Sequence, residues 1–170
     1  MFLLLIFLMK LLQAQLPFNR YPVYKGNDLG VAYTKTSSQF RIWSPPAQSA
    51  QLILYKEGEG GQPFKTINLK KGQSGTWFTS VEGDQKGMFY TFRIRFNNKW
   101  NNEVPDPYAK AAGVNGKRAM VINLKETDPS GWANEKSPAF SLQNKPTDAV
   151  IYELHVRDAS IADNSGIKYK

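Results

Sequence analysis

The sequence predicts an all-β fold, an immunoglobulin-like β-sandwich, followed by the truncated start of a (β/α)8 barrel. Over residues 29–123, short runs rich in β-branched and aromatic residues recur about every ten positions, without helical periodicity. A different run, residues 149–156, is short and mostly apolar, which is typical of a strand buried on both faces of a parallel sheet. The first pattern predicts the sandwich. The second predicts a βα-type domain that begins near residue 148 and needs about 250 residues to close as a barrel.

Turn residues separate the runs that predict the strands of the sandwich, which are residues 30–34, 39–43, 51–55, 64–69, 76–81, 88–96 and 119–123. Apolar and polar side chains alternate in the run 88–96, so we expect one face in the core and the other in solvent. The core face would carry Tyr90, Phe92, Ile94 and Phe96, and the solvent face Thr91, Arg93 and Arg95.

The chain divides into four predicted parts. Residues 1–15 are strongly apolar but too short to span a bilayer, so we expect no stable membrane span. This composition favours a secretory signal peptide that is cut after Ala14. The sequence therefore predicts export to the periplasm or the cell exterior. Lys10 interrupts this run, so an incorrectly assigned start or a tail lying on a membrane surface is the alternative. Residues 16–125 form the predicted sandwich, residues 126–147 a proline-containing linker held down by Trp132 or Phe140, and residues 148–170 the start of the barrel.

Composition excludes several classes of function. The net charge is +8, but the 22 Lys and Arg residues are scattered. Nucleic-acid binding requires basic residues clustered on one face, so we expect no nucleic-acid partner. The chain has no cysteine, and His155 is its one histidine. The sequence therefore predicts no disulfide, no metal site and no cofactor.

Three separated stretches carry a family resemblance. They are YKGNDLGVAYTKTSSQFRIWSPPAQSAQLILY (residues 24–55), VPDPYAKAAGVNGKRAMVINL (104–124) and VIYELHVRDASIADNSG (150–166). In this order they resemble type I pullulanases, starch-debranching glycoside hydrolases of family 13 in the alpha-amylase clan. The resemblance covers residues 21–170 and departs from the family at Ala159, where Phe is usual. It implies a carbohydrate-binding-module-48-like sandwich followed by the first strand of the catalytic barrel.

Glycoside hydrolysis uses a pair of carboxylates on either side of the scissile bond. The resemblance places that pair on later barrel strands, which this sequence does not contain. Glu153 and Asp158 match no catalytic position of the family, and His155 is expected to be a hydrogen-bonded residue inside the first barrel strand. The sequence therefore predicts no catalytic residue and no debranching activity for this chain alone.

One stretch of the predicted sandwich resembles a sugar-binding sequence. In glycogen-binding members of module family 48, a ligand-stacking Trp follows a strand hairpin shortly before an Asp-Pro pair, and Trp100 occupies this position. Arg93, seven residues earlier, would supply the basic side chain. The module's second stacking Trp has no counterpart in residues 55–64, so glucan affinity is expected to be weak. Packing against the barrel is the alternative role for Trp100, whereas Trp43 and Trp77 lie within strands and are expected in the core or at its edge.

Two hypotheses follow for the function. The first is the N-terminal portion of an exported pullulanase-type hydrolase acting on α-1,6 branches of α-glucans, with α-glucan and the missing catalytic barrel as partners. In this hypothesis the proline-fixed loop 104–108 would wedge the sandwich against the barrel. The alternative is a stand-alone secreted carbohydrate-binding or interaction domain.

Overall fold

The computed structural model describes residues 17–136 and 150–168, and the chain divides into two compact units between Asp128 and Pro129. The predicted signal peptide, residues 1–15, lies outside the described residues, as does half of the predicted linker, residues 137–147, with Phe140. Within the described residues, no helix combines the length and the apolar character needed to cross a membrane.

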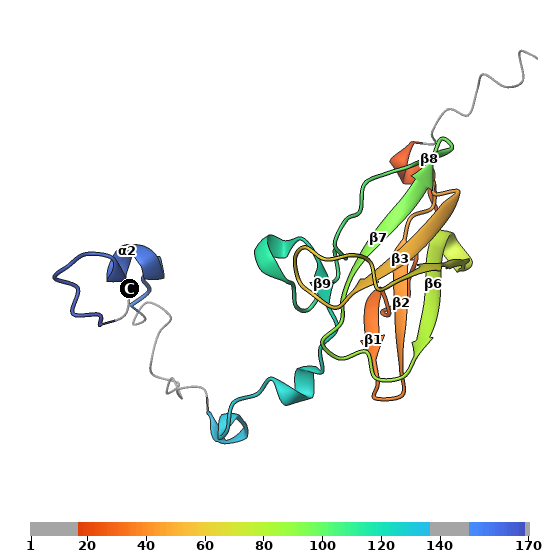
Figure 1. Ribbon diagram of the computed structural model, residues 1–170. Coiled ribbons are helices and arrows are strands. Elements are labelled where there is room, and N and C mark those ends of the chain that lie inside the picture. The colour runs from red at the N-terminus through yellow and green to blue at the C-terminus, as the bar shows by residue number, and fades with distance from the viewer. Residues whose placement is uncertain (1–16, 137–149, 169–170) are drawn as a thin grey trace, which may run out of the picture. The chain divides into compact units, whose positions relative to one another are not determined.

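The first unit is a sandwich of two antiparallel sheets (Figure 1), which confirms the predicted fold class. The first sheet has the order β1-β2-β6-β5, with strands β1 (Gly30–Tyr33), β2 (Ser37–Trp43), β6 (Thr76–Glu82) and β5 (Lys70–Lys71). The second sheet has the order β4-β3-β7-β8, with strands β4 (Lys65–Asn68), β3 (Ser49–Tyr55), β7 (Phe89–Phe96) and β8 (Lys99–Trp100). Strand β9 (Ala119–Met120) pairs with the beginning of β7.

Every predicted run of the sandwich contains a strand. Two short strands, β5 and β8, were not predicted, because two residues cannot display an alternating pattern. Single 3-10 turns occupy several connections: η1 (Phe18–Arg20), η2 (Gln73–Gly75), η3 (Val114–Gly116), η4 (Leu124–Glu126) and, in the second unit, η5 (Trp132–Asn134). Lys86 on the β6–β7 connection pairs with Glu126 of η4 at 2.6 Å, so η4 is fastened to the sandwich.

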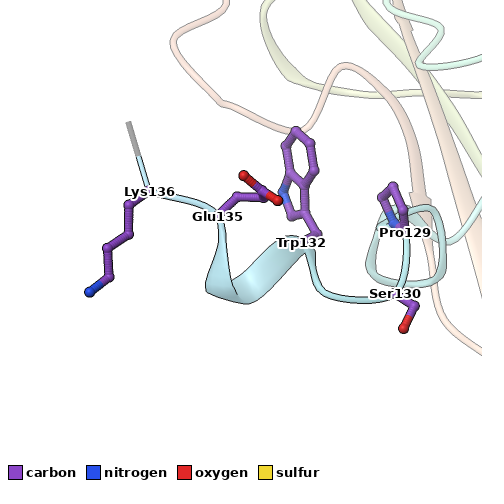
Figure 2. Close-up of a pocket in the computed structure, with 5 residues that line it drawn as sticks. All are labelled: Pro129, Ser130, Trp132, Glu135 and Lys136. Atoms are coloured by element: carbon purple, nitrogen blue, oxygen red, sulfur yellow. The ribbon is translucent and has the colours of Figure 1, made fainter. Parts of the chain in front are cut away.

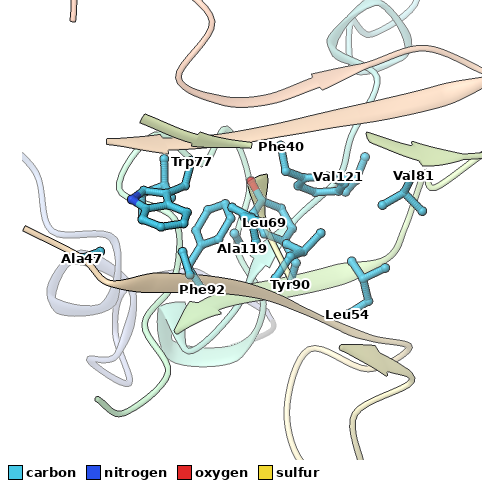
Figure 3. Close-up of a cluster of buried hydrophobic side chains, with 13 residues drawn as sticks. Phe40, Ala47, Leu54, Leu69, Trp77, Val81, Tyr90, Phe92, Ala119 and Val121 are labelled. Carbon is cyan, nitrogen blue, oxygen red and sulfur yellow. The ribbon is translucent and has the colours of Figure 1, made fainter. Parts of the chain in front are cut away.

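The core lies between the two sheets, and Figure 3 shows Phe40 and Trp77 pointing toward Phe92 and Leu54. The rings of Phe40 and Tyr90 meet edge to face at 5.0 Å between centroids, and those of Tyr90 and Phe92 at 5.8 Å. Each such pair contributes roughly 0.5–1.5 kcal/mol beyond the burial of its area. The predicted core face of β7 is thus confirmed for Tyr90 and Phe92, whereas Ile94 and Phe96 are half-buried toward the strand's end.

The predicted solvent face of β7 is wrong at Thr91, which is buried. The segment that follows β8 covers this part of the sheet, where Glu103 accepts hydrogen bonds from Thr91 Oγ1 (2.7 Å) and the Tyr55 hydroxyl (2.6 Å). The Arg118 guanidinium lies 3.4 Å above the Tyr55 ring. Burial and the hydrogen bond to Glu103 raise the pKa of Tyr55 to about 12. The outer face of the second sheet is therefore partly covered and partly open.

In the second unit, the expected barrel strand is not formed. Residues 150–155 have no strand structure, and they lead into the short helix α2 (Val156–Ser160). A strand exists only through hydrogen bonds to a neighbouring strand, and no described residue of this unit pairs with residues 150–155. His155 is hydrogen-bonded as predicted but does not lie inside a strand: it caps α2, with Nδ1 accepting from the Asp158 N–H at 3.4 Å.

Apolar side chains of residues 150–156 are exposed, Val150 and Ile151 to 90% each. Trp132 is also exposed, and Phe140 lies outside the described residues, so the expectation that one of them holds the linker down stays a prediction.

We expect that deleting residues 148–170 leaves the melting temperature of the sandwich unchanged and raises the solubility of the chain. The exposed apolar stretch offers unpaired backbone and β-prone side chains to other copies, which favours aggregation. Thermal unfolding of both forms, with the soluble fraction measured after incubation at high concentration, checks this expectation. A large drop in melting temperature on deletion would contradict it.

Candidate functional site

The two residues predicted to bind glucan lie on the open part of the second sheet's outer face. In the β7–β8 hairpin, Arg95 is paired with Trp100, and Asn97 and Asn98 form the turn with positive φ angles of 48° and 60°. Two consecutive positive φ angles are typical of the tight turn that matches strand twist. Because paired residues share a face, Trp100 lies on the same side of the sheet as Arg93 and Arg95.

The structure brings Arg93 and Trp100 together. The Arg93 guanidinium carbon lies 5.0 Å from the centre of the Trp100 ring, and Trp100 is 37% exposed. Arg93 Nη2 donates to Gln51 Oε1 at 3.1 Å, and Gln51 Nε2 donates to Asn68 Oδ1 at 2.9 Å. We call these four residues, Asn68, Gln51, Arg93 and Trp100, the Trp100 row.

The Trp100 row offers an aromatic ring and cationic donors. The Nε atoms of Arg93 and Arg95 are buried and have no hydrogen-bond partner among the described residues, so a ligand would meet only the terminal Nη groups of these guanidiniums. An aromatic face beside a guanidinium suits a neutral ligand that combines an apolar ring surface with hydroxyl groups.

The loop 104–108 is anchored to the core by Asp106. The buried Asp106 carboxylate accepts from the Tyr90 hydroxyl at 2.7 Å and from the Tyr108 N–H at 2.8 Å. Burial raises the pKa of Asp106, although both hydrogen bonds oppose that rise. The loop packs closely on β1, since a Cβ on Gly30 would lie 2.9 Å from the Tyr108 Cβ. These contacts make the loop rigid, while its predicted role as a wedge stays a prediction.

Other surface hollows provide weaker candidates. A hollow of about 520 Å³ lies beside Trp132, but one short stretch, residues 129–136, supplies all of its lining residues (Figure 2). Another, of about 350 Å³, lies between the segment 18–29, Trp43 and Tyr108. Within residues 17–136 and 150–168, no three His, Asp or Glu side chains are grouped closely enough to hold a metal ion.

Comparison with known proteins places the sandwich in a family. The chain is 39% identical to the pullulanase of Bacillus subtilis over 144 residues, which is 85% of this chain and 18% of that protein. The crystal structure of apo pullulanase from Paenibacillus barengoltzii superposes with a TM-score of 0.80 at 45% identity, over 89% of this chain. The family model of carbohydrate-binding module 48, the isoamylase N-terminal domain, matches residues 28–109. The chain carries a pullulanase-type module 48 domain.

The match confirms the resemblance inferred from the sequence. This chain spans 22% of the apo Paenibacillus pullulanase, so it corresponds to a carbohydrate-binding portion of a glycoside hydrolase. A further structure of that pullulanase, in complex with maltohexaose and alpha-cyclodextrin, superposes with a TM-score of 0.81. Sequence reasoning paired Arg93 with Trp100 but missed Gln51 and Asn68. Only the strand register, Asn68 opposite Gln51 and Gln51 opposite Arg93, places them beside the pair.

Proposed function

We propose that this domain binds α-glucan chains for a pullulanase-type hydrolase that cleaves α-1,6 branches, and that Trp100 and Arg93 make the contact. The observation that carries the proposal is the stacked Arg93–Trp100 pair on the open face of a module 48 sandwich. The apolar face of a glucose ring would lie on the indole, and the guanidinium would donate to sugar hydroxyls. We also propose export through residues 1–15.

The proposed affinity is low. One aromatic ring and one guanidinium provide a small contact area, and each sugar hydroxyl must exchange hydrogen bonds with water for hydrogen bonds with protein. We expect a dissociation constant in the millimolar range, which corresponds to a binding free energy on the order of −4 kcal/mol. Weak binding suits an accessory domain, because a linked catalytic domain would gain from the raised local concentration of substrate.

The exposed apolar stretch 150–156 supports an accessory domain over a stand-alone one. Val150, Ile151 and Tyr152 at its beginning are at least 80% exposed. We propose that this stretch becomes a strand when the parallel sheet of a catalytic barrel supplies its backbone partners.

Replacing Trp100 with alanine is expected to abolish retardation of the domain in amylopectin gels, because the stacking surface is lost. Native electrophoresis with and without amylopectin measures this effect. The matched control is Trp132→Ala, which removes another exposed tryptophan from the second unit and should leave retardation unchanged. Equal retardation of the wild type and the Trp100 variant would overturn the site assignment. Unfolding of the Trp100 variant would show instead that this residue packs against the sandwich.

A further inference from the structure

A line of polar contacts crosses the second sheet and ends at Trp100. Asn68 of β4 is paired with Gln51 of β3, and Gln51 is paired with Arg93 of β7, so the three side chains stand in one cross-strand row. Hydrogen bonds of 2.9 Å and 3.1 Å connect them in this order, and the last member stacks on Trp100.

The direction of these hydrogen bonds is important. A glutamine amide has a donor end and an acceptor end, and only the acceptor end can bind a guanidinium. Asn68 Oδ1 accepts from the donor end of Gln51, which leaves the Gln51 Oε1 acceptor for Arg93. Arg93 can only donate, so it fixes the end of Gln51 that it meets, and Asn68 turns its acceptor toward the other end. Asn68 lies two strands away from Arg93 and supports it by holding the Gln51 side chain in place.

Arg93 needs such support. An arginine side chain has many rotamers and loses conformational entropy when it is fixed in one position. A ligand that had to order the guanidinium itself would bind more weakly by that cost, whereas a guanidinium already held in place avoids it.

We infer that Gln51 and Asn68 are positioning residues that hold the Arg93 guanidinium over Trp100 before any sugar arrives. The role in sugar binding rests on the proposed function. The ordering of Arg93 and Trp100 in the free protein does not, so the two can be tested separately.

The first measurement uses the free protein. Gln51→Leu removes both ends of the amide, and we expect it to shift and broaden the NMR signals of the Arg93 Nε–H and the Trp100 indole N–H. Gln51→Glu keeps an acceptor for Arg93, and Asn68 can turn its amide to donate to the new carboxylate, so both signals should stay near their wild-type state. Asn68→Leu, at the exposed edge of the sheet, should give the same change as Gln51→Leu to a smaller degree.

The second measurement is a titration with maltoheptaose, followed by the same signals. We expect Gln51→Leu to weaken binding about threefold to tenfold, Gln51→Glu to restore it, and Arg93→Met to weaken it at least as much as Gln51→Leu. If Gln51 acts through Arg93, adding Gln51→Leu to Arg93→Met should cause no further loss, because the two effects belong to one interaction.

Two results would overturn the inference. One is unchanged Arg93 and Trp100 signals in free Gln51→Leu. The other is a double variant whose loss equals the product of the two single losses. Should the wild type bind no maltoheptaose, the proposed function fails, and the free-protein spectra alone decide whether Gln51 positions Arg93. Should Gln51→Leu fail to fold, Asn68→Leu provides the same comparison.

Discussion

Replacing Trp77 with alanine is expected to lower the free energy of unfolding of the sandwich by about 4 kcal/mol. Trp77 is only 6% exposed and lies in the central cluster between the sheets (Figure 3). Its indole N–H donates to the Ser44 carbonyl at 3.0 Å, and Ser44 is itself buried. The substitution therefore leaves a cavity and also a carbonyl group without its donor.

Urea denaturation measures this loss as a shift in the midpoint, with an unchanged slope if unfolding stays two-state. The total stability of a domain is usually about 5–15 kcal/mol, so the variant should be close to unfolding at 37 °C. Two tryptophan substitutions provide graded controls. Trp43 is half-buried and its N–H bonds to the carbonyls of Pro22 and Ser74, so Trp43→Ala should cause a smaller but clear loss. Trp132→Ala should change the midpoint very little. A loss below about 1 kcal/mol for Trp77→Ala would contradict the assigned core.

The sandwich could be predicted from the sequence because each strand shows its own pattern of apolar and polar residues, without reference to distant segments. Alternation in β7, with Tyr90 and Phe92 on one face, is a period-two signal that survives in a single strand. The family resemblance pointed to Arg93 and Trp100, and the hairpin turn at Asn97, which pairs residues close in sequence, places both on one face of the sheet. Local patterns thus predicted the strands, and the resemblance predicted one half of the candidate site.

The burial of Thr91 and the second half of the candidate site could not be predicted, because they depend on contacts between segments distant in sequence. Thr91 fits a solvent-facing pattern, and only the fold brings Glu103 over it and buries it. Gln51 and Asn68 are ordinary polar residues until the registers of β3, β4 and β7 align them.

In residues 150–155, a strand was predicted that the structure does not form. Their composition predicts a strand, but composition alone cannot supply the partner that a strand requires.

Replacing Asp106 with alanine is expected to lower the free energy of unfolding by about 3 kcal/mol. The change removes the acceptor of the Tyr90 hydroxyl, which is fully buried, and of the Tyr108 N–H. Asp106→Asn should cost much less. Its side-chain oxygen can still accept from Tyr108, and its amide group can donate to the Tyr90 oxygen. Urea midpoints at neutral pH compare the two variants with the wild type.

The asparagine variant also isolates the charge of Asp106 in a pH series. Burial raises the pKa of Asp106 above its ordinary value of 3.8, so the folded protein holds this proton more tightly than the unfolded chain does. The stability of the wild type relative to Asp106→Asn should therefore rise as the pH falls from neutral through the folded-state pKa, and become constant below the unfolded value. Taking the difference between the two proteins cancels the contributions of other acidic residues. A difference that stays flat with pH would show that the two hydrogen bonds balance the burial of the carboxylate, and one that falls toward acid pH would show that they outweigh it.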